Sequence, residues 1–119
     1  MPGRGFVPRP GPLSRARDTR RRDAAMIVLE AHGAVLGPEL PDDRDWHPRT
    51  RAWWDAWRRC PQAQMFGPVD WTHLLVAAVM HTRMCEGHAG AAREVRMWSA
   101  KFGATADDRA RLRWKVVVP

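Results

Sequence analysis

Residues 67–87 read GPVDWTHLLVAAVMHTRMCEG and predict the longest helix of the protein. Pro68 suits the first helical position because its φ angle is already helical, and Gly87 is a typical residue just beyond a helix end. The middle of this stretch, from Leu74 to Met80, is apolar on every side. A chain of 119 residues cannot easily cover all sides of such a helix, so we expect a neighbouring subunit to bind the uncovered side.

Further helices are predicted on both sides of this stretch. One begins at Pro48 and runs to about Arg59. Another covers about residues 91–102, and a short one begins at Thr105, which is a typical N-cap residue. The expected fold is therefore all-α, a small helical domain with three main helices plus a short fourth.

Tryptophans dominate the predicted core. Trp53 and Trp57 are one helical turn apart with Trp54 beside them, and such a stripe more often forms a core than a platform that stacks on unpaired bases. Trp46 and Trp114 lie outside the regular stripes and are better candidates for contacts between subunits. The residues expected to form the core and the oligomer contacts are Trp53, Trp57, Trp71, Leu74, Leu75, Val76, Val79 and Trp98.

Residues 1–23 differ in composition from the rest, with seven arginines, four prolines and three glycines. Such a segment cannot hold a helix or a strand ladder, so we expect a disordered basic arm. The chain carries a net charge of +7, and most of the excess lies in this arm. Contact with DNA phosphates is favoured over the alternative of a solvated tail that only keeps the protein soluble. The expected DNA-binding residues are Arg4, Arg9, Arg15, Arg17, Arg20, Arg21 and Arg22.

The organisation that follows from these patterns has four parts. After the arm, residues 24–45 are predicted to form an extended segment or a short hairpin around His32-Gly33, followed by a loop. A helical core and oligomerisation domain is expected over residues 46–114, and a short apolar tail over residues 115–119.

Several kinds of site find little support in the sequence. His81 and Cys85, with His88 nearby, resemble zinc ligands, but a structural zinc site needs four ligands, so we expect no metal. Asp107 and Asp108 are better explained by the negative charge that a helix start favours. No glycine-rich phosphate loop is found, and we expect no catalytic residue and no cofactor. The absence of a signal-peptide pattern and of a long apolar run indicates a cytosolic chain without a membrane span and with free thiols.

One long stretch resembles a known family. Residues 46–64 read WHPRTRAWWDAWRRCPQAQ, and the likeness continues through Asp70-Trp71, residues 92–96 and residues 100–113. These blocks resemble the tryptophan-rich signature of a group of small terminase subunits of tailed double-stranded-DNA phages and prophages. Several long blocks in the right order are far more specific than a single short motif.

The resemblance implies a ring-shaped oligomer in the cytoplasm of the bacterial host. Such a subunit binds viral double-stranded DNA, and it recruits and regulates the large ATPase/nuclease subunit for genome packaging without an active site of its own. A second basic strip, Arg109, Arg111, Arg113 and Lys115, either reaches DNA or the large subunit or is simply solvated. The alternative function is a small basic DNA-binding regulatory protein of a mobile element, which the apolar centre of the longest helix disfavours.

Overall fold

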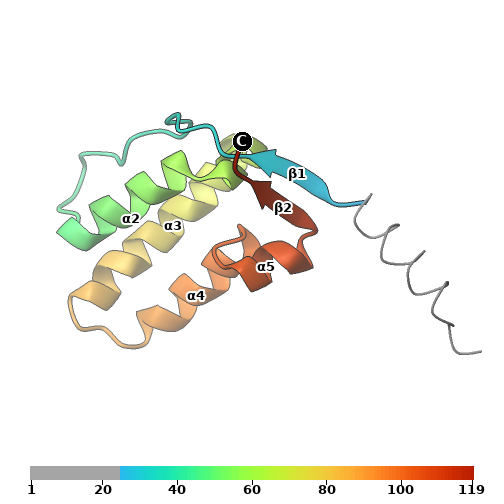
Figure 1. Cartoon of the computed structure of the whole chain (residues 1–119). Coiled ribbons are helices and arrows are strands. Elements are labelled where there is room, and N and C mark those ends of the chain that lie inside the picture. Colours follow the sequence, from blue (N-terminus) through green and yellow to red (C-terminus); the bar gives the residue numbers. More distant parts are fainter. Residues whose placement is uncertain (1–24) are drawn as a thin grey trace, which may run out of the picture.

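The computed structural model describes residues 25–119, which are mostly helical (Figure 1). A 3₁₀ helix joins two of the α-helices, and two short strands form a small sheet. The elements in chain order are β1 (Ile27–Glu30), α2 (Pro48–Arg59), η1 (Pro61–Met65), α3 (Pro68–Cys85), α4 (Ala91–Lys101), α5 (Ala106–Arg111) and β2 (Trp114–Val117). The predicted fold class, three main helices plus a short fourth, is confirmed, and the sheet is an addition to it.

The helices begin and end where local chemistry directs. At the start of α3, the Gly67 amide donates to Asp70 Oδ2 at 2.8 Å, and Pro68 occupies the first helical position. The helix ends before Gly87, whose φ of 105° is accessible to glycine but costly for other residues. At the start of α5, Thr105 and Asp108 exchange backbone and side-chain hydrogen bonds in a capping box.

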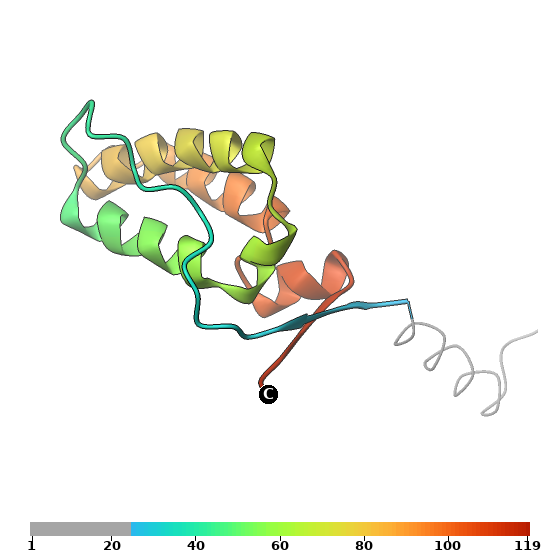
Figure 2. The same cartoon turned by 90° about the horizontal axis from the view of Figure 1, so that it is seen from above.

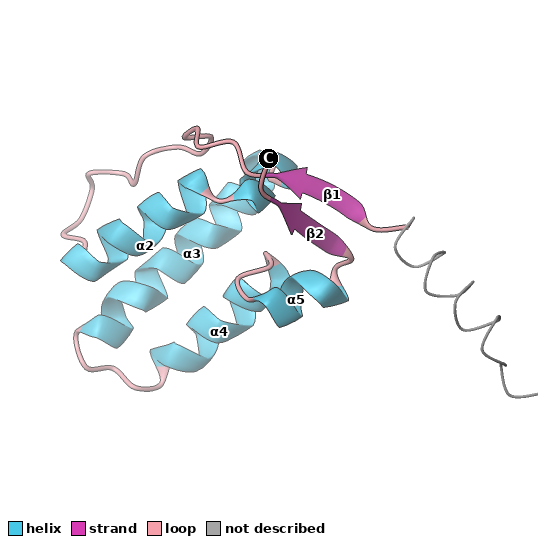
Figure 3. Cartoon of the chain, in the orientation of Figure 1, coloured by secondary structure: helices cyan, strands magenta, loops and turns pink. Residues whose placement is uncertain are grey.

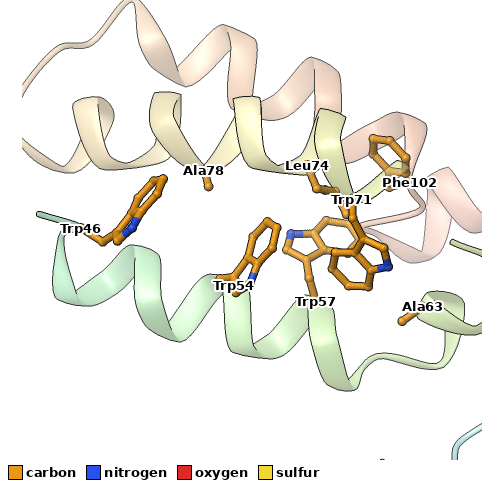
Figure 4. Packing of buried hydrophobic residues seen from close by; sticks show 8 residues of the cluster. All are labelled: Trp46, Trp54, Trp57, Ala63, Trp71, Leu74, Ala78 and Phe102. Carbon is orange, nitrogen blue, oxygen red and sulfur yellow. The ribbon is translucent and has the colours of Figure 1, made fainter. Parts of the chain in front are cut away.

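The core lies between α2 and α3, and α4 packs on another side of α3 (Figures 1 and 4). Trp54 and Trp57 of α2 point toward Trp71 and Leu74 of α3 in Figure 4, and Leu74 is fully buried. The Trp54 and Trp71 rings meet edge to face, with their centroids 5.5 Å apart. These indoles fill the space between α2 and α3. The α3 helix therefore packs against α2 on one side and against α4 on another.

The assignment of Trp46 to a contact between subunits is wrong. Its side chain is 4% exposed and belongs to the same core cluster, near Ala78 of α3 (Figure 4). Its indole nitrogen donates to the Pro41 carbonyl at 2.6 Å. The ring falls outside the helical stripe because it comes from the loop before α2, and this loop folds back over the core.

That loop, residues 31–47, crosses the α2 and α3 layer as an irregular strap (Figure 2). Side chains of α2 hold it through hydrogen bonds to its carbonyl oxygens. Trp54 Nε1 donates to the Pro38 carbonyl at 2.8 Å, and Arg58 Nε donates to the Gly37 carbonyl at 3.0 Å. The buried tryptophans therefore supply both the core and the donors that fix a segment without secondary structure.

The strand pairing distinguishes the two alternatives predicted for residues 24–45, an extended segment or a short hairpin. A hairpin around His32-Gly33 does not form, and β1 pairs instead with β2, in parallel, with Ile27 opposite Trp114 and Glu30 opposite Val117 (Figure 3). After β1 the chain leads into the strap, and the Leu36 amide donates to the Arg58 carbonyl of α2 at 2.9 Å. The residues that would form the second strand of a hairpin therefore contact α2 instead. The apolar end of the chain pairs with β1 in their place.

Gly37 gives a test of how tightly the strap lies on the core. A methyl group at this position would come within 2.4 Å of two ring carbons of Trp71, which is itself buried. We expect Gly37→Ala to lower the free energy of unfolding by about 1–3 kcal/mol, because overpacking forces the ring or the strap to move. Thermal or urea unfolding measures this change.

Gly90→Ala is the matched control for this substitution. Gly90 has no atom within 4 Å of the added methyl group, and its φ of −61° suits any residue. We expect this variant to unfold within about 0.5 kcal/mol of the parent protein. Equal losses of stability in both variants would contradict the close contact between the strap and Trp71.

Candidate functional site

The seven arm arginines lie outside the described residues 25–119, as does the prediction that the arm is disordered. The structure does place the point where this segment joins the folded chain, because Ala25 lies two residues before β1. The Ile27 amide donates to the Arg113 carbonyl at 2.8 Å, and Val28 lies opposite Lys115. The root of the basic segment is therefore next to the second basic strip, although the two are at opposite ends of the sequence (Figure 3).

The four residues of the second strip do not share one role. Arg109 donates from one guanidinium nitrogen to the carbonyls of Gly103 and Ala104, at 3.0 and 3.1 Å, so it supports the turn between α4 and α5. Arg111 forms an ion pair with Asp108. These two arginines therefore contribute to the local structure of α5.

Arg113 and Lys115 differ from the other two. Both are exposed, and neither forms an ion pair within residues 25–119. Arg113 has a φ of 61°, which turns the chain from the end of α5 into β2 and places its side chain at the start of the sheet. The folded domain thus offers two unpaired cations beside the root of the arm.

The second candidate surface is the side of α3 that the rest of the chain leaves open. Of the predicted residues, Trp57, Trp71 and Leu74 are buried. A further set packs half-buried around this core: Trp53, Leu75, Val79 and Trp98. Val76 differs, because it is 46% exposed, and Val69 on the same side of the helix is 68% exposed. An apolar strip of α3 therefore faces solvent in the isolated chain.

The tryptophan stripe itself is not arranged for stacking on bases. Trp54 and Trp57 are 3% and 5% exposed, so their faces are covered by the core. Trp53 is half-buried and stacks on the His81 ring, with centroids 4.8 Å apart. These contacts agree with a packing role for the stripe.

The sequence of this domain also matches a model of a protein family. The model of the phage terminase small subunit matches residues 3–119. The chain belongs to the phage terminase small subunit family. Neither the curated proteins nor the solved structures contain a match to it.

Membership in the terminase small subunit family gives the chain a general role in phage DNA packaging. Members of this family are in general the DNA-recognition, non-catalytic subunits, with phage DNA and a large subunit as partners. Among residues 25–119, none of the helices has the length and apolar character needed to cross a membrane.

The histidine and cysteine cluster of this terminase small subunit is a packing feature. His81 Nδ1 lies 2.7 Å from the Thr50 hydroxyl, which also accepts a hydrogen bond from the Thr82 hydroxyl at 2.9 Å. Burial lowers the pKa of His81, and the nearby His47 lowers it further. Within residues 25–119 no group of three or more His, Cys, Asp or Glu side chains is arranged to hold a metal ion.

Two other groups with shifted pKa values, Cys60 and Asp108, also have structural explanations. Burial raises the pKa of Cys60 to about 11, so its thiol stays protonated and weakly nucleophilic at neutral pH. The hydrogen bond with the Thr105 side chain lowers the pKa of Asp108, and Arg111 adds to this effect. Asp108 therefore stabilises the start of α5 as a carboxylate, as its position at a helix N-terminus favours.

Sequence reasoning did not predict that the root of the arm and the second basic strip lie together. The parallel pairing of two four-residue strands joins them, and neither strand predicts this pairing alone. The one available signal was the pair of short apolar stretches at the two ends of the folded region, Met26 to Leu29 and Val116 to Val118.

Proposed function

We propose that this terminase small subunit binds viral double-stranded DNA, assembles into an oligomeric ring, and recruits and regulates the large ATPase/nuclease subunit. The parallel pairing of β1 with β2 is the observation that carries the DNA-binding part. It holds β1, which follows the arginine-rich segment in sequence, next to the exposed Arg113 and Lys115. Family membership supports this role over the alternative of a regulatory protein of a mobile element.

The DNA contacts proposed for this surface are contacts to phosphates. Arginine suits them because its planar guanidinium binds phosphate oxygens in a bidentate manner. Phosphate contacts position a protein on DNA without reading the base sequence, so this surface supplies affinity and orientation. Each phosphate neutralised releases condensed counterions, and affinity therefore decreases steeply as salt increases.

Assembly is proposed to use the open side of α3. A small domain buries only about two thirds of the surface of its unfolded chain, and association adds to that burial. Val69 and Val76 form the centre of the proposed contact, since both are exposed apolar residues two turns apart on one helix. Apolar contacts are insensitive to ionic strength, in contrast to the DNA contacts.

In this proposal, the large subunit supplies the chemistry. The side chains that look reactive in the sequence have packing or capping roles, as described for His81, Cys60 and Asp108. The small subunit then acts by marking viral DNA and by presenting it to the enzyme that hydrolyses ATP and cuts the genome. Binding surfaces alone are sufficient for such a role.

The mass of the purified protein in solution tests the assembly part. Light scattering at low and at high salt should show one discrete species of several copies in both conditions, because the proposed contacts are apolar. A viral DNA fragment should add to this mass at low salt and be released at high salt. A monomer at both salt concentrations, with and without DNA, would contradict the ring.

A further inference from the structure

An apolar groove of about 570 Å³ opens between the strap and the first half of α3. Its lining combines aromatic rings with aliphatic and proline side chains, including Leu36, Pro38, Trp54, Phe66, Trp71 and Leu75. Trp54 and Trp71 are buried in the core, whereas Leu36 is 46% exposed. The function proposed above does not use this groove.

The groove is preformed in the folded chain. The hydrogen bonds from Trp54 to the Pro38 carbonyl and from Arg58 to the Gly37 carbonyl fix the strap that forms one wall. On the other wall, the edge-to-face contact between Phe66 and Trp71, with centroids 5.3 Å apart, holds the start of α3. A bound segment would therefore meet rigid surfaces, which reduces the ordering cost of binding.

One wall of this groove belongs to an acidic loop. Glu39 lines it directly, and the same loop carries three more exposed carboxylates, Asp42, Asp43 and Asp45. Within residues 25–119, Asp43 pairs with Arg44 at 3.9 Å, while Glu39, Asp42 and Asp45 form no ion pair. The chemistry of the groove thus suits an apolar segment that also carries positive charge.

The chain itself contains a segment with this chemistry. Residues 6–13 read FVPRPGPL, which combines Phe6, Val7 and Leu13 with three alternating prolines and Arg9. Aromatic grooves bind proline-rich segments well because proline rings are apolar and their backbone loses little entropy on binding. These residues are too few to bury apolar area against one another, but a preformed groove gives them a surface.

Chain length allows the segment to reach the groove of its own chain. Leu36 lies eleven residues after Ala25, and Leu13 lies twelve residues before it. A chain extends by at most about 3.5 Å per residue, so residues 13–25 span up to about 40 Å. The eleven residues from Ala25 to Leu36 span slightly less, at most about 39 Å, so no neighbouring copy is needed.

We propose that residues 6–13 bind in this groove of the same chain. Arg9 then lies near the carboxylates of the strap. The five arginines from Arg15 to Arg22 form the connection between the groove and β1, because both ends of that connection are held by the domain. Such a tether presents the arginines to DNA with less conformational freedom to lose.

Photo-crosslinking in the full-length chain tests this proposal without DNA. Phe6 is replaced by p-benzoylphenylalanine, and the products are mapped by mass spectrometry in a mixture of normal and isotope-labelled protein. We expect crosslinks within single chains to groove residues such as Leu36, Pro38 and Leu75. Crosslinks that scatter over the helices, or that join labelled to unlabelled chains, would overturn the proposal.

A pair of lysine substitutions controls for folding and charge. Leu36→Lys places a cation on the margin of the groove and should reduce crosslinking to it about tenfold, since burying this charge beside Arg9 is unfavourable. Val35→Lys makes the same change at the next residue, which is 40% exposed and does not line the groove, and should leave the yield unchanged. Equal yields in both variants would overturn the proposal. DNA binding and assembly are tested by separate experiments, so a failure of this proposal is distinguishable from a failure of the proposed function.

Discussion

Glutamine substitutions at Arg15, Arg17, Arg20, Arg21 and Arg22 together are expected to weaken DNA binding by about 10²- to 10⁴-fold near 0.1 M salt. Each arginine that contacts a phosphate contributes about 0.9 to the magnitude of the slope of log affinity against log salt, so this magnitude should decrease by up to about 4.5. Fluorescence anisotropy with a labelled viral DNA fragment, titrated over a range of salt concentrations, measures both quantities.

The folded domain provides a control with the same change in net charge. α5 is the α-helix that packs on β2, and five exposed arginines on the other α-helices form no ion pair within residues 25–119: Arg49, Arg51, Arg83, Arg93 and Arg96. Glutamine at these five positions should change the affinity far less. If both variants lose affinity equally, net charge alone explains binding, and the assignment to residues 1–23 is wrong.

Val76→Asp is expected to dissociate the oligomer into monomers. Val76 is 46% exposed in the isolated chain, so aspartate at this position is compatible with the fold of the monomer. In the proposed contact the same carboxylate would be buried without a partner, which costs several kcal/mol at every interface of the ring. Sedimentation or light scattering measures the loss of assembly, and circular dichroism verifies that the helices remain.

Met97→Asp is the matched control for this variant. Met97 is 45% exposed, nearly the same fraction as Val76, but it lies on α4. We expect this variant to assemble normally. A stable oligomer in Val76→Asp together with dissociation in Met97→Asp would move the interface from α3 to α4.

The two experiments also separate the two surfaces. The arginine variant should keep its mass in solution, because the open side of α3 is unchanged. The Val76→Asp variant retains all the arginines, but each monomer engages DNA alone and loses the gain that several linked binding sites provide. The arginine variant should therefore combine weak DNA binding with intact assembly, whereas the Val76→Asp variant should combine weaker DNA binding with the loss of assembly.

The helices were predictable because their signals are local. Pro48, Gly67-Pro68 and Gly87 mark helix ends through their own backbone preferences, and the structure places the ends of α2 and α3 beside them. The capping box of α5 depends on two residues three positions apart, Thr105 and Asp108, so its start was also predictable. The spacing of Trp53 and Trp57 identified the side of α2 that packs on α3.

Only the tertiary structure determined where the remaining segments lie, because their partners are distant in sequence. β1 and β2 have four residues each and pair across the whole folded region, so neither predicts the other, and a local hairpin fits the sequence of β1 equally well. Trp46 joins the core because the strap folds back through hydrogen bonds from Trp54 and Arg58 to its carbonyl oxygens. The sequence by itself thus determined the helices, through contacts between neighbouring residues, and the charge of the arm, through its composition. The position of Ile27 beside Arg113 and the groove beneath the strap depend on long-range contacts that only the folded chain forms.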